Sequence, residues 1–326
     1  MIEKERIAWI DAIKGFAIIC VVLGHVVNGY MDAGLYTQYT AFLHDIYNIV
    51  YAFHMPLFFA ISGFLFREAY VQGDIPQSRI KKEPLNRQMM NLLLIYIAYS
   101  LLLGVSKMLF SGAVNKTVAG IDLLMIWAKP IQLYWYLYVL LLFYAAFRID
   151  KVRNVNPSIM LPVLAVLSAC SAYIPAIPWF QVNRFLYYAF FFMLGICYRQ
   201  ITEKKAILRG GECLCIVSVV LSVVLWSRTQ YLRSIPVANF IIAAGLTLGL
   251  LDLFRSVCFL SKLPVLNICG KVLHGNLPAA YLLCHGCQGS ICKNRRKCLR
   301  ERFMQPDHQH RDPYHIQRGR EKARTL

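Results

Sequence analysis

Long apolar runs recur along the first 254 residues of this chain, and they constrain its fold more than any other feature. Eight such runs are separated by short polar connections: 7–29, 40–66, 89–111, 131–149, 159–174, 183–200, 211–227 and 235–254. Most approach the roughly 17–25 residues that a helix needs to cross the hydrocarbon of a bilayer. Only 16% of the residues are charged, against about 25% in a soluble domain. The sequence therefore predicts an all-α, multi-pass membrane helix bundle with about eight transmembrane helices.

The distribution of lysine and arginine predicts the orientation of the bundle. With the N-terminus in the cytoplasm, seventeen of these residues up to residue 271 fall on the cytoplasmic side, including Arg148 and Arg199 at the ends of their runs, and the loops of the opposite side contain four. Positively charged loops are retained in the cytoplasm, so we expect a multi-pass protein of the inner (cytoplasmic) membrane with a cytoplasmic N-terminus. The net charge is +18, its basic part up to residue 271 is thereby assigned mainly to topology, and no nucleic-acid partner is expected. The first apolar run is too long for a cleavable signal peptide.

Three polar residues of the first apolar run share one face of the predicted helix. Lys14 and His25 are eleven residues apart, which places them about 20° apart around the axis, and Asp11 lies about 60° from Lys14. A bilayer turns such a stripe toward the interior of the bundle. Along the axis Lys14 and His25 are roughly 16 Å apart, so they cannot touch within this helix. The structural alternative is that Asp11 and Lys14 neutralise each other while His25 bonds a backbone carbonyl.

The second apolar run contains a histidine beside a proline. Pro56 has no amide hydrogen to donate to the carbonyl four residues earlier, so we expect the helix to bend or loosen beside His54. The small residues that follow, Ala60, Ser62 and Gly63, let membrane helices approach closely. A single histidine of this kind is commonly structural. The second histidine in the preceding run makes a functional role equally plausible.

Two stretches resemble the membrane-bound acyltransferase-3 family: IDAIKGFAIICVVLGH (10–25) and FHMPLFFAISGFLF (53–66). The family's opening motif is a basic residue, ten intervening residues and a histidine. Lys14 and His25 meet that spacing, with lysine where many members have arginine. Weaker similarities at YWYL (134–137) and FFMLG (191–195) extend the resemblance over about residues 7–271. The lysine and the Phe-His-Met-Pro block are most similar to sugar O-acetylases of the fucose 4-O-acetylase type.

This resemblance implies a fold and an activity. Family members have about ten transmembrane helices and O-acylate sugars and small molecules. The implied donor is acetyl-CoA or another acyl-CoA on the cytoplasmic side, and the implied acceptor is a sugar or a cell-surface glycan. No tightly bound cofactor is expected, and the remaining partner is the lipid bilayer.

Acyl transfer to a hydroxyl group needs a base, and histidine has a suitable pKa. His25, toward the external end of its helix, is the candidate catalytic base for an external sugar hydroxyl. His54, near mid-membrane, is the second catalytic candidate, as an acid–base group or an orienting partner. Whether an acyl-histidine intermediate forms does not follow from the sequence.

Four further residues are candidates for binding the donor or substrate. Lys14, held charged by Asp11, lies toward the cytoplasmic side and can attract an anionic donor. Arg87 resembles the basic entry to the third family helix and lies on the same side in the predicted topology. Trp135 belongs to the weak 134–137 similarity. The alternative for this aromatic cluster is an interfacial belt, in which the rings sit at headgroup level.

Two other function classes compete with an acyltransferase. Intramembrane Asp, Lys and His with a proline break also describe the proton relay of a transporter or exporter. Against that class, the chain has no obvious inverted repeat, and most later apolar runs have no charged residue at their centre. The third alternative is an inactive, truncated family member.

The chain departs from the family after Lys271. Members continue from a Gly-Lys with a helix that begins Tyr-Ser-x-Glu-Ile-Tyr-Leu-Leu-His, whereas residues 272–281 read VLHGNLPAAY. Codons for these residues, read one nucleotide later, permit Tyr-Ser-Met-Glu-Ile-Tyr-Leu-Leu-His. We interpret this agreement as a change of reading frame at or just after Lys271.

The predicted domain organisation follows from this change of frame. Residues 1–271 form an acyltransferase-3-like transmembrane domain, and 272–326 form a basic, Cys- and His-rich tail that we expect to be out of frame and disordered. The alternative for the tail is a zinc site, since Cys284 and Cys287 have a legitimate ligand spacing, with Cys292 and Cys298 nearby. A shifted frame accounts for composition, cysteines and lost hydrophobicity together, so no metal site is predicted.

Overall fold

The computed structural model describes five stretches of the chain, and all regular structure in them is helical. These stretches are 8–70 without 33 and 35, 85–109, 120–147 without 132 and 133, 155–203 without 176 and 178, and 236–257, together with residues 149, 152, 217, 220, 260, 263 and 266. No strand occurs among the described residues, so the predicted all-α fold is confirmed.

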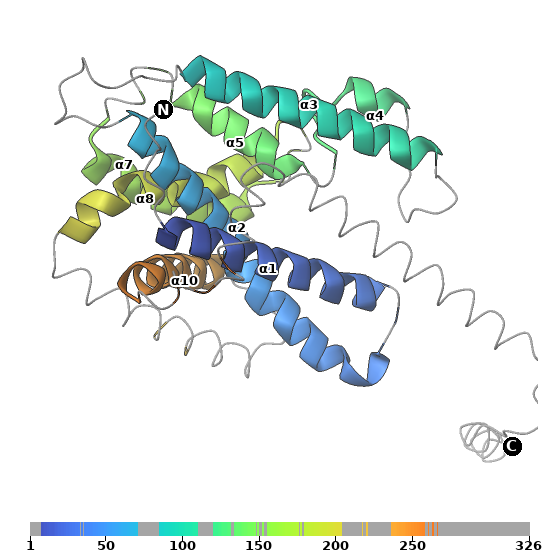
Figure 1. Ribbon diagram of the computed structural model, residues 1–326, viewed down its shortest axis with the longest axis horizontal. Helices are drawn as coiled ribbons and strands as arrows, with labels where there is room; N and C mark the ends of the chain where they lie inside the picture. Colours follow the sequence, from blue (N-terminus) through green and yellow to red (C-terminus); the bar gives the residue numbers. More distant parts are fainter. Residues whose placement is uncertain are drawn as a thin grey trace, which may run out of the picture.

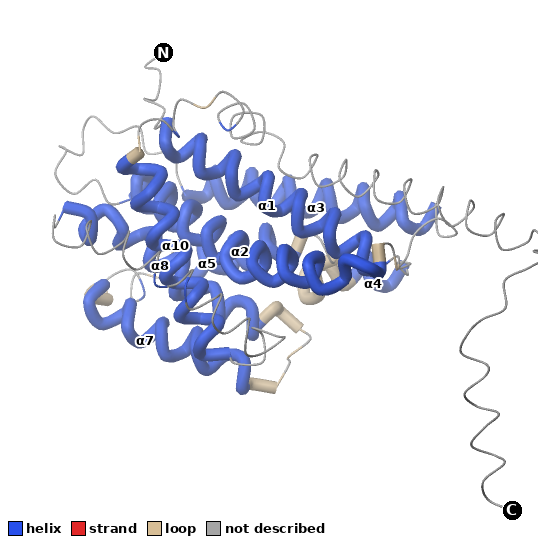
Figure 2. The backbone as a smooth tube through the Cα atoms, turned by 90° about the horizontal axis from the view of Figure 1, so that it is seen from below, coloured by secondary structure: helices blue, strands red, loops and turns tan. Residues whose placement is uncertain are grey.

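Eight α-helices are described, and Figure 1 shows their arrangement. The long helices that could each cross a membrane are α1 (Ala8–Asp32), α2 (Thr40–Tyr70), α3 (Leu85–Leu109) and α10 (Pro236–Ser256). The others are α4 (Gly120–Leu124), α5 (Trp135–Ala146), α7 (Pro157–Cys170) and α8 (Val182–Glu203), with 3-10 turns at Thr37–Tyr39 and Ser171–Tyr173. Figure 2 shows α7 on the side of the bundle away from α1.

The predicted apolar runs agree with these helices. Seven of the eight runs coincide with described helices, three of which are shorter apolar helices (α5, α7 and α8). The eighth run, 211–227, lies outside the described residues apart from Val217 and Val220. The outer surface is also apolar: on α3, for example, Leu94, Leu102 and Leu109 are 56–74% exposed, as expected where a helix faces lipid rather than water. A membrane helix bundle accounts for both observations.

Ring contacts fix the relative directions of the helices. Trp9, near the start of α1, lies 5.3 Å from Phe64, near the end of α2, so these helices are antiparallel. Phe16 of α1 likewise contacts Phe254, near the end of α10. α3 is antiparallel to α5, whereas α2, α5 and α8 are parallel. These relations are expected for a chain whose successive apolar runs cross a membrane in alternating directions.

Two ends of the bundle can therefore be defined. The Lys14 end is the one where α1 and α3 begin and where α2, α8 and α10 finish, and the His25 end is the opposite one (Figure 1). In the predicted topology the Lys14 end is cytoplasmic.

α2 is the central helix, and two glycines set its contact with α8. A Cβ at Gly63 of α2 would overlap the carbonyl group of Phe192, and a Cβ at Gly195 of α8 would overlap the carbonyl group of Ala60. The two backbones therefore touch at reciprocal notches, as in small-residue packing of membrane helices. The close approach predicted from the small residues around Gly63 is confirmed.

The predicted loosening at Pro56 does not interrupt α2, which is a single helix from Thr40 to Tyr70. Membrane helices tolerate proline because neighbouring helices and small local adjustments satisfy the carbonyl that loses its donor. His54 is consequently held at a fixed rotation on a continuous helix.

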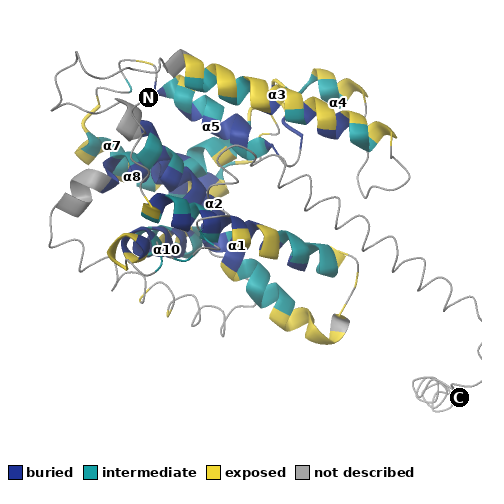
Figure 3. Ribbon diagram, in the orientation of Figure 1, coloured by how far each residue is buried: buried dark blue, intermediate teal, exposed yellow. Residues whose placement is uncertain are grey.

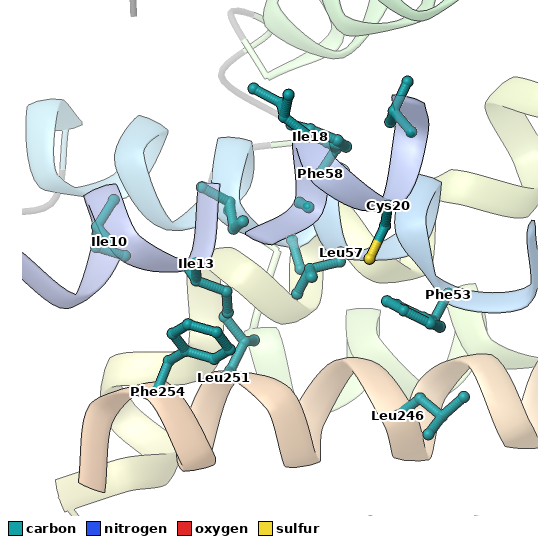
Figure 4. Close-up of a cluster of buried hydrophobic side chains, with 14 of the residues drawn as sticks. Ile10, Ile13, Ile18, Cys20, Phe53, Leu57, Phe58, Leu246, Leu251 and Phe254 are labelled. Carbon is teal, nitrogen blue, oxygen red and sulfur yellow. The ribbon is translucent and has the colours of Figure 1, made fainter. Parts of the chain in front are cut away.

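The main core lies where α1, α2 and α10 meet. Figure 4 shows Ile13 of α1 beside Leu251 and Phe254 of α10, and Phe53 of α2 between the same helices. Figure 3 shows the buried colour concentrated on the facing sides of these helices, with exposed residues along α3 and on the outer parts of α1 and α2. A second, largely aromatic core joins α2, α5 and α8.

Candidate active site

A tyrosine on α2 contacts both of the candidate catalytic histidines. The ring of Tyr51 is edge-on to His54 on its own helix, with centroids 4.8 Å apart. It is also edge-on to His25 of α1, at 6.4 Å. His54 is buried and His25 is half-buried. His25 and His54 therefore lie on two neighbouring helices, α1 and α2, and both contact the same aromatic ring.

The backbone fixes the tautomer of His54. Its Nδ1 lies 2.6 Å from the carbonyl oxygen of Val50, one turn earlier on α2. A carbonyl only accepts hydrogen bonds, so Nδ1 donates in the neutral ring and the lone pair lies on Nε2. The atom of His54 that can take up a proton is therefore Nε2.

Gly24 makes room for the tyrosine. A Cβ at this position would lie 2.9 Å from Cε2 of Tyr51 and 3.1 Å from a methyl carbon of Val50. Tyr47 stacks on the same ring, with centroids 4.1 Å apart. The glycine beside His25 therefore allows α1 to approach α2 at the level of Tyr51.

Asp11 and Lys14 form an ion pair at the other end of α1. The distance from Lys14 Nζ to Asp11 Oδ1 is 3.8 Å, and both side chains are 13% exposed. This places both residues mainly inside the bundle, as the stripe predicts. It also agrees with the self-neutralising alternative, because each charge already has a partner.

Arg87 is exposed in the first turns of α3. α3 packs mainly on α5, whereas α1 packs on α2 and α10. Arg87 and Lys14 therefore lie at the same end of the bundle on helices that share no main interface. The structure does not bring these two cations into one group.

Trp135 belongs to an aromatic group that joins α5, α8 and α2. Its ring stacks on Tyr188, with centroids 5.4 Å apart, and Tyr188 stacks on the buried Phe59 at 4.6 Å. The guanidinium carbon of Arg184 lies 4.4 Å from the centroid of the Trp135 ring. Trp135 is therefore a packed, partly exposed residue beside a cation, rather than a ring projecting alone into an interface.

α5 is also joined to α2 by a polar contact. The hydroxyl groups of Ser62 and Tyr136 are 2.7 Å apart and hydrogen-bonded, and the ring of Tyr136 lies against Phe58 and Phe59. This contact fixes α5 two turns along α2 from His54.

A buried polar pair at the Lys14 end was not predicted. The hydroxyl group of Tyr198 on α8 donates to Oδ1 of Asp252 on α10, and both residues are buried. The guanidinium carbon of Arg255 lies 6.0 Å from the Tyr198 ring. The sequence signal for this pair is an acidic residue inside the last turns of an apolar run, which is costly in a membrane unless it is paired.

Two other residues of the site region were missed. Tyr51 is three residues before His54, and Arg184 opens an otherwise uncharged aromatic segment. An arginine at the start of an apolar run is a usable signal, whereas the place of Tyr51 depends on how α1 and α2 are rotated against each other. No group of metal-ligating side chains occurs among the described residues, and Cys284, Cys287, Cys292 and Cys298 lie outside them.

Comparisons with known proteins relate this chain to a family. A family model described as an acyltransferase domain matches residues 7–273. The nodulation protein NolL of Sinorhizobium fredii is 28% identical over 228 residues, which cover 68% of this chain and 58% of NolL. The matched part of the chain thus spans less than two thirds of that curated relative. No solved structure matches. The family match ends close to Lys271, and the change of frame there stays a prediction.

Proposed function

The chain belongs to the acyltransferase family whose model covers residues 7–273, and from this membership we propose that it transfers an acyl group from acyl-CoA to a hydroxyl group of a sugar or cell-surface glycan. The acyl group is acetyl in the first instance. The observation that carries the proposal is the placement of His25 and His54 around Tyr51.

The proposed reaction needs one proton to be moved. Transfer breaks the O–H bond of the acceptor and the C–S bond of the thioester, and forms the C–O bond of an ester. In the proposal, His25 takes the hydroxyl proton during attack and returns it to the departing thiolate, which leaves as CoA. His54, whose Nδ1 is held by the Val50 carbonyl, orients the site or shares the proton through Nε2.

Donor and acceptor are proposed to enter from opposite ends. Lys14, paired with Asp11, would exchange its partner for, or share its charge with, an anionic acyl-CoA at the Lys14 end. The thioester would then have to reach along roughly 16 Å of α1 to meet His25. An acceptor hydroxyl would approach from the His25 end.

The test is transfer of radiolabelled acetyl from acetyl-CoA in membranes that contain the protein, with a mixture of neutral and acidic glycans as acceptors. We expect His25→Ala to abolish incorporation while membrane insertion is unchanged. His44→Ala is the matched control, because His44 lies in the first turns of α2, away from Tyr51 in sequence. Incorporation that survives His25→Ala removes His25 from the role of base.

The same assay separates an enzyme from a transporter. A proton-coupled transporter would move a solute across vesicles without esterifying it. Solute movement that depends on His25 and His54, with no label in the glycan, would replace the proposed function.

The sides from which donor and acceptor are proposed to enter are tested by the membrane topology of the chain. A reporter inserted in 30–39 should be external and one inserted in 67–88 cytoplasmic, as the positive-inside distribution requires. The opposite result at either position would exchange the proposed donor and acceptor sides.

A further inference from the structure

Arg184 occupies an unusual place at the His25 end. It is exposed in the first turn of α8, while α8 otherwise continues as an apolar, aromatic helix as far as Tyr198. In the predicted topology this is the external side, where lysine and arginine are depleted. A cation kept on that side calls for a specific explanation.

The partners of Arg184 are uncharged. Nη1 donates to Oε1 of Gln181 over 2.7 Å, and the guanidinium plane lies on Trp135. Asp11 and Lys14 form their ion pair at the opposite end of the bundle, and no described carboxylate pairs with Arg184. An arginine has five N–H donors in a rigid fork, so stacking and one bond to Gln181 orient the group without satisfying it.

The segment before Arg184 is held in a defined conformation by hydrogen bonds. Asn183 accepts a hydrogen bond from the amide of Ile177 over 2.9 Å and donates to the carbonyl of Ile174 over 3.1 Å. Phe180 and Gln181 have φ angles of 57° and 52°. Such backbone angles are unfavourable for residues with a side chain and persist where the surroundings impose them, often at binding sites.

A second loop completes the surface. The amide of Phe180 donates to the carbonyl of Ala128 over 2.7 Å, and the Phe180 ring is edge-on to Trp127 at 5.9 Å. Trp127 is nevertheless 63% exposed and Phe180 46% exposed. The two aromatic rings are thus held in place while much of each ring remains exposed at the protein surface.

We propose that Arg184 and Gln181, with the exposed rings of Trp127 and Phe180, form a recognition site for an acidic saccharide. A carboxylate or phosphate of the saccharide binds the guanidinium fork, and the C–H face of a sugar ring lies against the aromatic rings. This inference rests on the proposed function, in which a glycan is the acceptor, and it narrows that glycan to an anionic one. A lipid headgroup phosphate offers the same oxyanion chemistry and is the competing source.

The experiment measures binding, so it does not depend on transfer. The full chain is placed in nanodiscs of phosphatidylcholine and titrated calorimetrically with an oligogalacturonate and with its methyl ester of the same length. We expect the acid to bind at least about tenfold more tightly than the ester, because a charge-assisted bidentate pair is lost on esterification. Arg184→Gln should remove this difference. Arg184→Lys should retain only part of it, because an ammonium group cannot form the planar fork.

Lys129→Gln is the matched control, since Lys129 is an exposed cation of the loop that contacts Phe180. We expect this variant to keep the preference for the acid. Equal binding of acid and ester, or an equal loss in the Lys129 and Arg184 variants, would overturn the proposal. Thermal unfolding of each variant shows whether it is folded.

A lipid arm distinguishes the two oxyanion sources. The titration is repeated in nanodiscs that contain phosphatidylglycerol. Acid-selective binding that persists supports the saccharide, whereas its loss with the anionic lipid assigns Arg184 to headgroups and overturns the proposal. Acid-selective binding without any acetyl transfer would leave this site standing and remove the proposed function. Transfer with equal binding of acid and ester would do the reverse.

Discussion

The two ends of the bundle treat their polar side chains differently. At the Lys14 end, the described polar groups in the helix interiors are matched with one another: Asp11 with Lys14, and Asp252 with Tyr198. At the His25 end, His25 and His54 border an aromatic ring, and Arg184 lies on another aromatic ring. The Asp11–Lys14 pair compensates two charges and the Tyr198–Asp252 hydrogen bond joins α8 to α10, whereas the aromatic contacts at the other end orient His25, His54 and Arg184.

This contrast indicates a division of work along α1 and α2. Removing one member of a buried pair destabilises the fold, because the other member is left buried without compensation for its desolvation. A histidine held by ring edges and by one backbone carbonyl has a defined orientation and can still exchange a proton. The predictions below test whether the Lys14 end is mainly structural and the His25 end mainly chemical, in order of decreasing expected effect.

The largest effect should come from the reading frame after Lys271. The carbonyl group of Leu266 lies directly against Gly15 of α1, so the chain is still at the Lys14 end shortly before the predicted change. Removing one nucleotide after codon 271 should restore the family's next helix, and we expect the restored protein to transfer acetyl much faster than the chain as written. Sequencing the gene across codon 271 and assaying both products checks this. An in-frame gene without the alternative reading would contradict it.

The next largest effect concerns the packing of α2 against α8, on which both ends of the bundle depend. Gly195→Ala puts a Cβ into the carbonyl group of Ala60, and a backbone contact cannot be relieved by a rotamer change. We expect α8 to be forced away from α2, with a loss of about 3 kcal/mol of stability and failure of both ends together. Fluorescence-detected size exclusion and thermal unfolding measure this. Gly120→Ala is the control, because only the end of Met108 lies near that position, at 4.0 Å.

The helices and their relative directions could be predicted from the sequence, because hydrophobic length and loop charge are local properties. The stripe of Asp11 and Lys14 was predictable for the same reason, since spacing along one helix determines it. The contact of Tyr51 with both histidines was not predictable, because it depends on how close α1 comes to α2 at Gly24. The pairs Trp135–Arg184 and Tyr198–Asp252 join distant parts of the sequence, and only packing shows them.

A third prediction tests whether the Lys14 end also serves the donor. Lys14→Ala should raise the KM for acetyl-CoA about tenfold, the loss expected for one charge-assisted contact, while Lys14→Arg should be tolerated because it keeps the cation. Transfer kinetics at varied acetyl-CoA measure the effect. An unchanged KM in Lys14→Ala would leave the Asp11–Lys14 pair with a structural role alone and would sharpen the contrast between the ends.

A fourth prediction concerns the spacing at the His25 end. Gly24→Ala brings a methyl group to 2.9 Å from the Tyr51 ring, which can move because it is a side chain. We expect only a small change in stability, and a several-fold fall in kcat with the acetyl-CoA KM unchanged, since a displaced ring misplaces both histidines. Transfer kinetics and thermal unfolding are compared with Gly120→Ala. An unchanged kcat would mean that Tyr51 does not position the histidines.

The smallest effect on transfer should come from the buried pair at the Lys14 end. Tyr198→Phe keeps the ring among Trp9 and Phe64 and removes only the hydroxyl group that donates to Asp252. The buried carboxyl group then lacks that donor, which should cost about 1–2 kcal/mol of stability, while kcat stays near that of the unaltered chain. Tyr173→Phe is the control, because Tyr173 is 66% exposed. Thermal unfolding and transfer kinetics are measured on the same preparations. If kcat falls although the protein remains folded, the Tyr198–Asp252 pair takes part in catalysis, and the assignment of structure to one end and chemistry to the other is wrong.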